Sequence, residues 1–369
     1  MRTVLAGVPS FWMAALIVTP HVGHAQDIAI PEPLLIEDPA GRWVDPIDIN
    51  EAGLVIGLFT TRERATPFSW SKDTGFVELA LPMPVAFAVA WGLNDCGEIV
   101  GEAEVPDAEG GHAVLWHATG EIEDLGTLGG AASRASDINN RGAIVGSSQT
   151  TEPGNGEAFI WTRAEGMRSL GTLGGVSSHA RAVNERDEVV GVSDTADGSY
   201  HGFYWSHATG MLDLGTLERS ASDAFAIDDR GLVVGLAGGG LVERGRAFLW
   251  SRRRGFQVFA GDTDPIAFAR RINRYGWMVG ESVHEFEDEE EAMQFGSQYR
   301  HARLWLGPDR VVDLHPGYGI SSFAFGVNDR KQVIGSVSFT NGNDSAGLLW
   351  EFDAGNRGSA AAPPLCCHR

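Results

Sequence analysis

The chain is poor in cysteine, in positive charge and in long apolar runs, and each shortage excludes a class of protein. Its three cysteines are too few for the disulfide framework of small secreted domains, so the 369 residues must be stabilised by a packed core. A formal net charge of −21 excludes binding to the phosphate backbone of nucleic acids, which needs a basic surface. Beyond residues 1–25 no segment approaches the roughly 18 apolar residues of a membrane-spanning helix, so no membrane span is predicted in the mature chain.

What the chain has instead is a repeat. Seven of its eleven tryptophans recur at nearly fixed spacing: Trp70, Trp116, Trp161, Trp205, Trp250, Trp305 and Trp350. Each copy also carries a glycine that ends a short apolar run: Gly57, Gly101, Gly146, Gly191, Gly235, Gly280 and Gly335. Seven residues before the glycine stands Asn50, Asn94, Asn139, Asn184, Asp228, Asn273 or Asn328. Successive copies begin 44 or 45 residues apart, and 55 apart at the last step, which is the period of a propeller blade.

Each repeat predicts four short antiparallel strands. In the third copy the first strand ends at Ile138 and the second, reached through an Asn-x-x-Gly turn, ends at Gly146. The third strand ends at Trp161, and the fourth covers residues 167–170 after a polar turn with glycine. The recurring tryptophan is predicted to fill the wedge between neighbouring sheets and to bury about 150–250 Å².

The two ends of the array predict a closed ring. No clear fourth strand follows Trp350, whereas residues 33–38 precede the first copy and look like an unattached fourth strand. If that strand completes the last blade, the ring has no open sheet edge to protect. The prediction is an all-β, seven-bladed β-propeller over residues 33–352; a linear stack is the alternative and leaves this strand unpaired. The predicted repeats lie near 44–82, 86–130, 131–175, 176–220, 221–263, 264–317 and 320–352, with 33–38 as the closing strand.

The first 25 residues have the pattern of a secretory signal peptide. Arg2 is followed by a mostly apolar stretch and by small residues before a cleavage point after Ala25. The expected location is therefore periplasmic or extracellular, and an uncleaved anchor is the alternative. Residues 353–369 are expected to form a disordered tail; it holds Cys366 and Cys367, which are too few ligands for a metal site on their own.

The repeat resembles the HAF repeat of exported bacterial proteins described as probable extracellular repeat proteins. Residues 124–130 read Asp-Leu-Gly-Thr-Leu-Gly-Gly, residues 169–175 repeat this with serine first, and residues 246–250 read Arg-Ala-Phe-Leu-Trp. The histidine that gives the repeat its name remains at His112, His201 and His301, and the last three copies and the first lack the Gly-Thr-Leu-Gly-Gly segment. The resemblance covers residues 33–352 and implies export and a repeat architecture. It implies no reaction, because the family carries no established catalytic residues.

Function is expected on one face of the disc. The links between second and third strands and between successive blades share a face and vary in sequence, as binding loops on a rigid scaffold do. Five residues before the Asn or Asp, near the axis on this face, stand Asp45, Arg134, His179 and Asp223. They are candidates to line a pocket, and His179 with Asp223 are candidates for an acid–base pair; polar contacts between blades are the alternative.

The longest variable link carries a run of acidic residues that includes Glu287 and Asp288. Its carboxylates are candidate Ca²⁺ ligands or a docking site for a basic partner. The run lacks the alternating Asp-x-Asp-x-Asp-Gly order of a calcium loop, so a solvated acidic loop is the reading that we favour and no cofactor is predicted.

Two classes of function remain open at this stage. The chain has no Gly-x-Ser-x-Gly elbow, no His-Glu-x-x-His pair and no phosphate-binding loop. We therefore expect a noncatalytic, monomeric binding or adhesion module that presents its loop face to a glycan or a protein. The alternative is a hydrolase or lyase that acts on polysaccharide, with His179, Asp223 and Asp45 as its catalytic groups.

Overall fold

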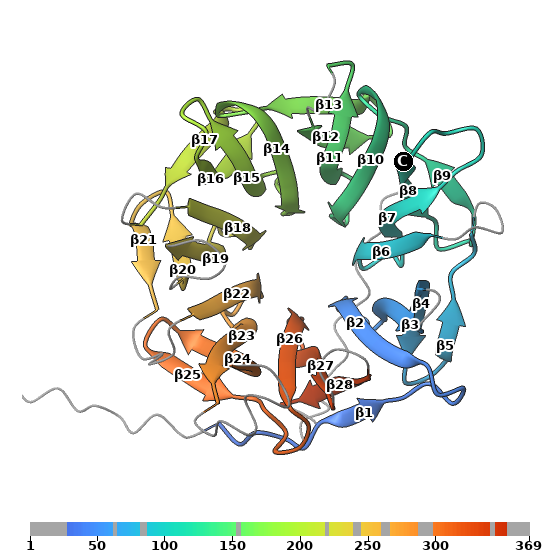
Figure 1. The fold of residues 1–369 in the computed structure, drawn as a ribbon, viewed down its shortest axis with the longest axis vertical. Coiled ribbons are helices and arrows are strands. Elements are labelled where there is room, and N and C mark those ends of the chain that lie inside the picture. The colour runs from blue at the N-terminus through green and yellow to red at the C-terminus, as the bar shows by residue number, and fades with distance from the viewer. Residues whose placement is uncertain are drawn as a thin grey trace, which may run out of the picture.

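The computed structural model consists of strands alone in the part of the chain that it describes (Figure 1). The structure describes residues 28–61, 65–81, 87–152, 156–217, 221–238, 245–259, 266–286, 298–339 and 344–352. The predicted signal peptide and tail, with Cys366 and Cys367, and the acidic residues Glu287 and Asp288 lie outside these ranges.

The strands form seven four-stranded antiparallel sheets around a common axis, so the predicted propeller is confirmed (Figure 1). Blade 1 contains β2 (Trp43–Ile49), β3 (Val55–Thr60), β4 (Ala65–Ser71) and β5 (Gly75–Glu78), and blade 2 contains β6 (Ala88–Leu93), β7 (Ile99–Glu104), β8 (Gly111–Trp116) and β9 (Ile122–Asp124). Blade 3 contains β10 (Gly129–Ile138), β11 (Ile144–Thr150), β12 (Gly156–Thr162) and β13 (Gly166–Gly171), and blade 4 contains β14 (Gly174–Val183), β15 (Val189–Thr195), β16 (Tyr200–Ser206) and β17 (Gly210–Gly215). Blade 5 contains β18 (Ala221–Ile227), β19 (Val233–Gly238), β20 (Arg246–Ser251) and β21 (Gly255–Val258), and blade 6 contains β22 (Ile266–Ile272), β23 (Met278–Glu285), β24 (Gln298–Gly307) and β25 (Arg310–Asp313). Blade 7 contains β26 (Ser321–Val327), β27 (Gln332–Ser338), β28 (Ser345–Glu351) and the N-terminal strand β1 (Leu34–Ile36).

Strand β1 closes the ring, as the sequence predicted. Leu34 pairs with Leu349 and Ile36 with Gly347, so β1 lies antiparallel to β28 as the outermost strand of blade 7 (Figure 1). The linear stack is therefore wrong. The Ile36 side chain is 1% exposed and packs with Val44 of blade 1 and with Leu349.

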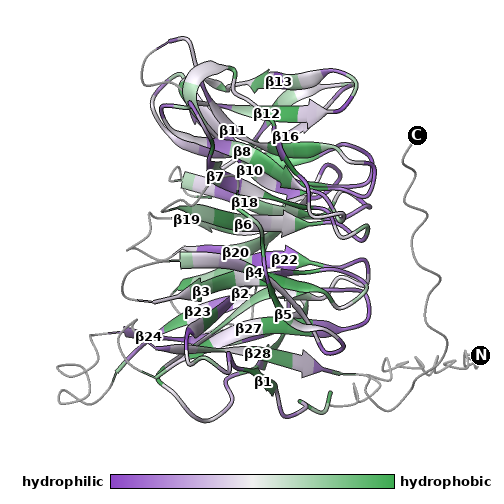
Figure 2. Cartoon of the chain, turned by 90° about the vertical axis from the view of Figure 1, so that its right-hand side faces the viewer, coloured by the Kyte–Doolittle hydropathy of each residue, from purple (hydrophilic) through white to green (hydrophobic). Residues whose placement is uncertain are grey.

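The hydrophobic core is divided into wedges, one between each pair of neighbouring blades. Between blades 3 and 4, for example, Val145 and Ile160 pack against Phe203 and Trp205. Six of the recurring tryptophans are buried and Trp250 is half-buried, which confirms their predicted role as wedge fillers. Seen from the side, hydrophilic residues gather in the turns and apolar ones in the strands (Figure 2).

The Asn-x-x-Gly turns do more than reverse the chain. The Asn139 side-chain oxygen accepts from the N–H groups of Arg141 and Ala143 at 3.0 and 2.9 Å, which holds the turn. Its side-chain nitrogen donates to the Asn184 carbonyl of the next blade at 2.9 Å. The residue after the asparagine forms a second link, because the Asn140 N–H donates to the Glu185 carboxylate at 2.9 Å. Both links recur around the ring on the turn face of the disc.

The repeated histidine and aspartate join the third and fourth strands of a blade. His112 binds Asp124 at 2.9 Å, His201 binds Asp213 at 2.9 Å and His301 binds Asp313 at 2.8 Å. Each histidine therefore pairs within its own blade, and the three do not converge on a common ligand. In blade 3 Ser169 and Glu157 form the equivalent hydrogen bond.

Two further observations concern cysteine and the membrane. Cys96, in the turn between β6 and β7, is disulfide-bonded. Among the described residues, no helix has the length and hydropathy needed to cross a bilayer.

Candidate functional site: the axial cavity

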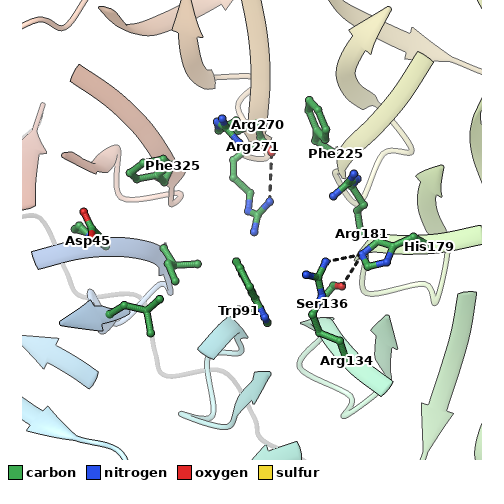
Figure 3. A pocket seen from close by; sticks show the side chains of 13 residues that line it. Asp45, Trp91, Arg134, Ser136, His179, Arg181, Phe225, Arg270, Arg271 and Phe325 are labelled. Atoms are coloured by element: carbon green, nitrogen blue, oxygen red, sulfur yellow. Dashed lines mark hydrogen bonds between the residues drawn. The ribbon is translucent and has the colours of Figure 1, made fainter. Parts of the chain in front are cut away.

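A cavity of about 410 Å³ lies on the ring axis. Every blade contributes to its wall through the innermost strand (Figure 3). The position three residues before the Asn or Asp contributes in all seven blades: Ile47, Trp91, Ser136, Arg181, Phe225, Arg270 and Phe325.

A β-bulge in each innermost strand aims this residue at the axis. In blade 3 Ala135 pairs with Gly146 and Asp137 pairs with Val145, which leaves Ser136 between them without a partner. The same shift of register occurs in the other six blades. A bulge turns a side chain out of the pleat, and here it turns seven of them into the cavity.

The repeated glycine of the second strand makes room for the bulge. A Cβ atom at Gly146 would lie 1.9 Å from the Arg134 carbonyl oxygen, and the equivalent contact in the other blades would be 1.8 to 2.4 Å. No other residue type fits so close an approach of two backbones.

Three of the four polar residues predicted to face the axis line the cavity: Asp45, Arg134 and His179 (Figure 3). Asp223 lies behind the wall, where it accepts two hydrogen bonds from Arg181 at 2.8 and 2.6 Å. Among the described residues, no hydrogen bond joins His179 to Asp223. The structure does not assemble the predicted acid–base pair, because each residue has another partner.

His179 is held as a neutral acceptor. Its Nε2 atom lies 3.0 Å from Arg134 Nη2 and 3.3 Å from Ser136 Oγ (Figure 3). An arginine only donates, so Nε2 must carry the lone pair, and Nδ1 donates to Ser147 Oγ at 2.8 Å. Burial, together with the charges of Arg181 and Arg134, lowers the pKa of His179 to about 3.

Carboxylates behind the wall hold two of the arginines. Arg181 is fixed by Asp223, and Arg270 donates to the fully buried Glu281 at 2.6 Å. Each carboxylate accepts hydrogen bonds from one side of its guanidinium. The guanidinium groups therefore face the cavity, and the acids lie behind them.

Arg271 also lines the cavity, and two acids lie near its guanidinium. Its Nε atom lies 3.8 Å from Asp48, and its Nη1 donates to the Arg270 carbonyl at 3.3 Å. Asp137 faces the same guanidinium, and burial raises the pKa of this carboxyl to about 7.

Arg134 differs from these three arginines. In the part of the chain that the structure describes, it forms no ion pair with a carboxylate, and its hydrogen-bond partner is the neutral His179. The guanidinium lies 4.9 Å from the centre of the Trp91 ring. Burial lowers the pKa of Arg134, and the charge of Glu102, which lies beyond ion-pair distance, only partly offsets this loss of water.

The cavity wall opposite Arg134 carries a negative charge. Asp45, in blade 1, accepts from Ser345 Oγ at 2.6 Å and from Thr60 Oγ1 at 3.1 Å. The cavity therefore combines an aromatic face, a cationic side and one carboxylate. Within the described residues, no group of three or more His, Cys, Asp or Glu is placed to hold a metal ion.

The bulged position is what the sequence reasoning missed. The sequence prediction placed the site two residues earlier, at the start of the strand, because polar residues stand there in four of the seven copies. A usable signal was present, since the bulged position varies from isoleucine to tryptophan to arginine, while the residue before it is alanine in six of seven copies.

The comparisons with known proteins support the fold. No family model and no curated protein match the chain. A catalytically inactive virginiamycin B lyase from Staphylococcus aureus, with quinupristin, is similar at a TM-score of 0.54 and 12% identity, over 86% of this chain and 98% of that one. The β-propeller domain of the Trilobed protease from Pyrococcus furiosus is similar at 0.52 and 10% identity, over 87% and 97%. TolB from Acinetobacter baumannii gives 0.44 at 14% identity over 61% of this chain, which spans 58% of the TolB chain.

Proposed function

We propose that this protein is an exported, noncatalytic binding module of the HAF-repeat type, and that its ligand enters the axial cavity from the loop face. The observation that carries the proposal is the cavity wall, to which a bulged side chain from every blade contributes. Three of these side chains are aromatic: Trp91, Phe225 and Phe325. Concave, largely apolar sites with a few convergent polar groups are typical of ligand pockets.

The chemistry of the cavity favours binding over turnover. A general base near neutral pH needs a free lone pair and a pKa close to 7. The Nε2 lone pair of His179 is engaged by Arg134, and the pKa of this histidine is about 3. Asp223 is engaged by Arg181. A glycan is the ligand class that we propose, since sugars bind through aromatic faces and arrays of polar groups.

A glycan-array screen with the mature chain tests the proposal. We expect binding to at least one glycan class, loss of binding in Trp91→Ala and Phe225→Ala, and an unchanged melting temperature. Tyr200→Ala is the matched control, because Tyr200 is 59% exposed at the start of β16 and does not line the cavity. Turnover of a polysaccharide that is lost in His179→Ala or Asp223→Ala would instead identify a hydrolase or lyase, and no binding to any array member would refute the module.

A further inference from the structure

We infer that the axial cavity is a subsite for an acidic sugar, a six-membered sugar ring that bears a carboxylate, as a hexuronic acid does. The inference rests on the proposed function and assigns the ligand's chemical class. Three features of the wall support it: an arginine with no carboxylate at ion-pair distance among the described residues, an aromatic face beside this arginine, and a carboxylate on the other side.

Arg134 supplies the anion site. Arg181, Arg270 and Arg271 each have a carboxylate within 3.8 Å. Among the described residues Arg134 has no carboxylate at ion-pair distance and contacts the neutral His179, while the charge of Glu102 acts on it from farther away. A guanidinium that has lost water binds an anion more strongly than an exposed one, and its planar fork matches a carboxylate. The ordinary role of such an arginine is a structural ion pair, but among the described residues no carboxylate lies close enough to Arg134 to form one.

Trp91 supplies the ring face. It reaches toward the centre of the cavity beside Arg134, and Arg271 reaches toward the centre from the opposite side (Figure 3). Trp91 is not one of the seven recurring wedge tryptophans, and it is only half-buried. An indole in this setting stacks on the apolar face of a sugar ring, while the adjacent guanidinium faces the ring substituent.

Asp45 makes the cavity selective for a sugar acid over an aromatic acid. Its carboxylate lies on the blade 1 side of the cavity and is an acceptor only, so it favours a ligand that brings hydroxyl donors. Benzoate has the ring and the carboxylate but no hydroxyl group. A volume of about 410 Å³ lies in the range of small-ligand pockets.

Calorimetric titration of the mature chain tests this assignment. The probes are a galacturonate trisaccharide, a neutral cello-trisaccharide and benzoate. We expect the galacturonate trisaccharide to bind at least about tenfold more tightly than either other probe, because one charge-assisted contact is worth about that much. Its affinity should also fall with added salt, and that of the neutral probe should not.

Substitutions of Arg134 and Asp45 test which ligand group each residue contacts. Arg134→Gln keeps a donor toward His179 and removes the charge, so it should abolish the preference for the acidic probe, and Arg134→Lys should retain part of it. Arg163→Gln is the control, because this arginine is 66% exposed and lies in a turn outside the cavity. Asp45→Asn should weaken galacturonate binding and leave benzoate binding unchanged.

The outcomes separate the two proposals. Equal affinity for the neutral and acidic trisaccharides, or a full preference that survives in Arg134→Gln, overturns the acidic-sugar subsite while leaving the binding module in place. If neither trisaccharide binds, and no glycan of the array binds either, the proposed function itself fails. Melting temperatures of all variants establish that the folded chain is being measured.

Discussion

At the scale of single residues, one glycine in each blade decides whether the cavity exists. Gly146 lies directly against the backbone of Arg134, and the bulge that exposes Ser136 to the cavity is found at this contact. The sequence shows this glycine as the end of an apolar run and therefore as part of a strand. Its function depends on a neighbouring strand, which a linear pattern does not reveal.

Gly146→Ala should destabilise the protein strongly. The new Cβ would lie 1.9 Å from a carbonyl oxygen that cannot move without disrupting the bulge, so we expect a loss of more than about 4 kcal/mol or failure to fold. Gly156→Ala in the same blade is the control, because the nearest atom to its Cβ would be 3.9 Å away. Thermal unfolding of both variants is the measurement, and equal stability of the two would contradict this account of the glycine.

A second prediction at this scale concerns pH. Burial, with the charges of Asp329 and Asp95, raises the pKa of Glu51 to about 7. The folded state therefore binds this proton more tightly than the unfolded state, and the resulting stability is lost as pH rises from about 4.5 through 7. Glu51→Gln keeps the acceptor for the Asp329 N–H and removes the charge. We expect its melting temperature to exceed that of the parent at pH 8 and to match it near pH 4.5, whereas Glu121→Gln at an exposed site should show no such trend.

At the scale of elements, the sequence predicted the blades better than the joints between them. The tryptophan period and the turn residues determine four strands per unit, because both signals are local. Strands β10 and β14 begin at Gly129 and Gly174, two residues before the predicted repeat limits, since these glycines pair with Thr150 and Thr195 of the next strand. The hydrogen bonds between blades escaped prediction because they join residues about 45 positions apart.

The joint between blades 5 and 6 lacks both of the repeated links. Asp228 replaces the donor asparagine, and a carboxylate cannot donate to the Asn273 carbonyl. Arg274 stands where the other blades have an acceptor, so the Asp229 N–H has no partner of this kind among the described residues. The other six joints have both links: 1–2, 2–3, 3–4, 4–5, 6–7 and 7–1.

Restoring both links should strengthen this joint. The double variant Asp228→Asn with Arg274→Asn copies blade 3, where Asn139 and Asn140 perform these roles. Two hydrogen bonds of about 1 kcal/mol each outweigh the ion pairs that are lost, because Arg230 and Arg274 are at least half exposed. We expect a net gain of about 1 kcal/mol and slower hydrogen exchange at the Asp229 amide; no change in exchange there would contradict the assignment of the weak joint.

At the scale of the whole molecule, two features set the site: the closed ring and the electrostatics of its axis. The ring was predictable because a fourth strand was missing at one end of the sequence and present at the other. The cavity was only partly predictable. Asp45, Arg134 and His179 were found from their register, but their roles depend on Ser136, Ser147 and Ser345, which other blades bring into contact.

Closure itself can be tested by removing β1. A chain that begins at Ala40 lacks Ile36, whose side chain is 1% exposed between Val44 and Leu349, and it leaves β28 as an open edge. Losing a buried isoleucine and a strand pair should cost several kcal/mol and lower the melting temperature by roughly 5–10 °C. A chain that begins at Glu32 keeps β1 and is the control. Because the missing element is a single strand that adds to an exposed edge, a peptide of residues 30–40 should bind the shortened chain and restore part of the lost stability. If the shortened chain has the same melting temperature as the control, β1 does not hold the ring together. The cavity then keeps its shape by wedge packing alone.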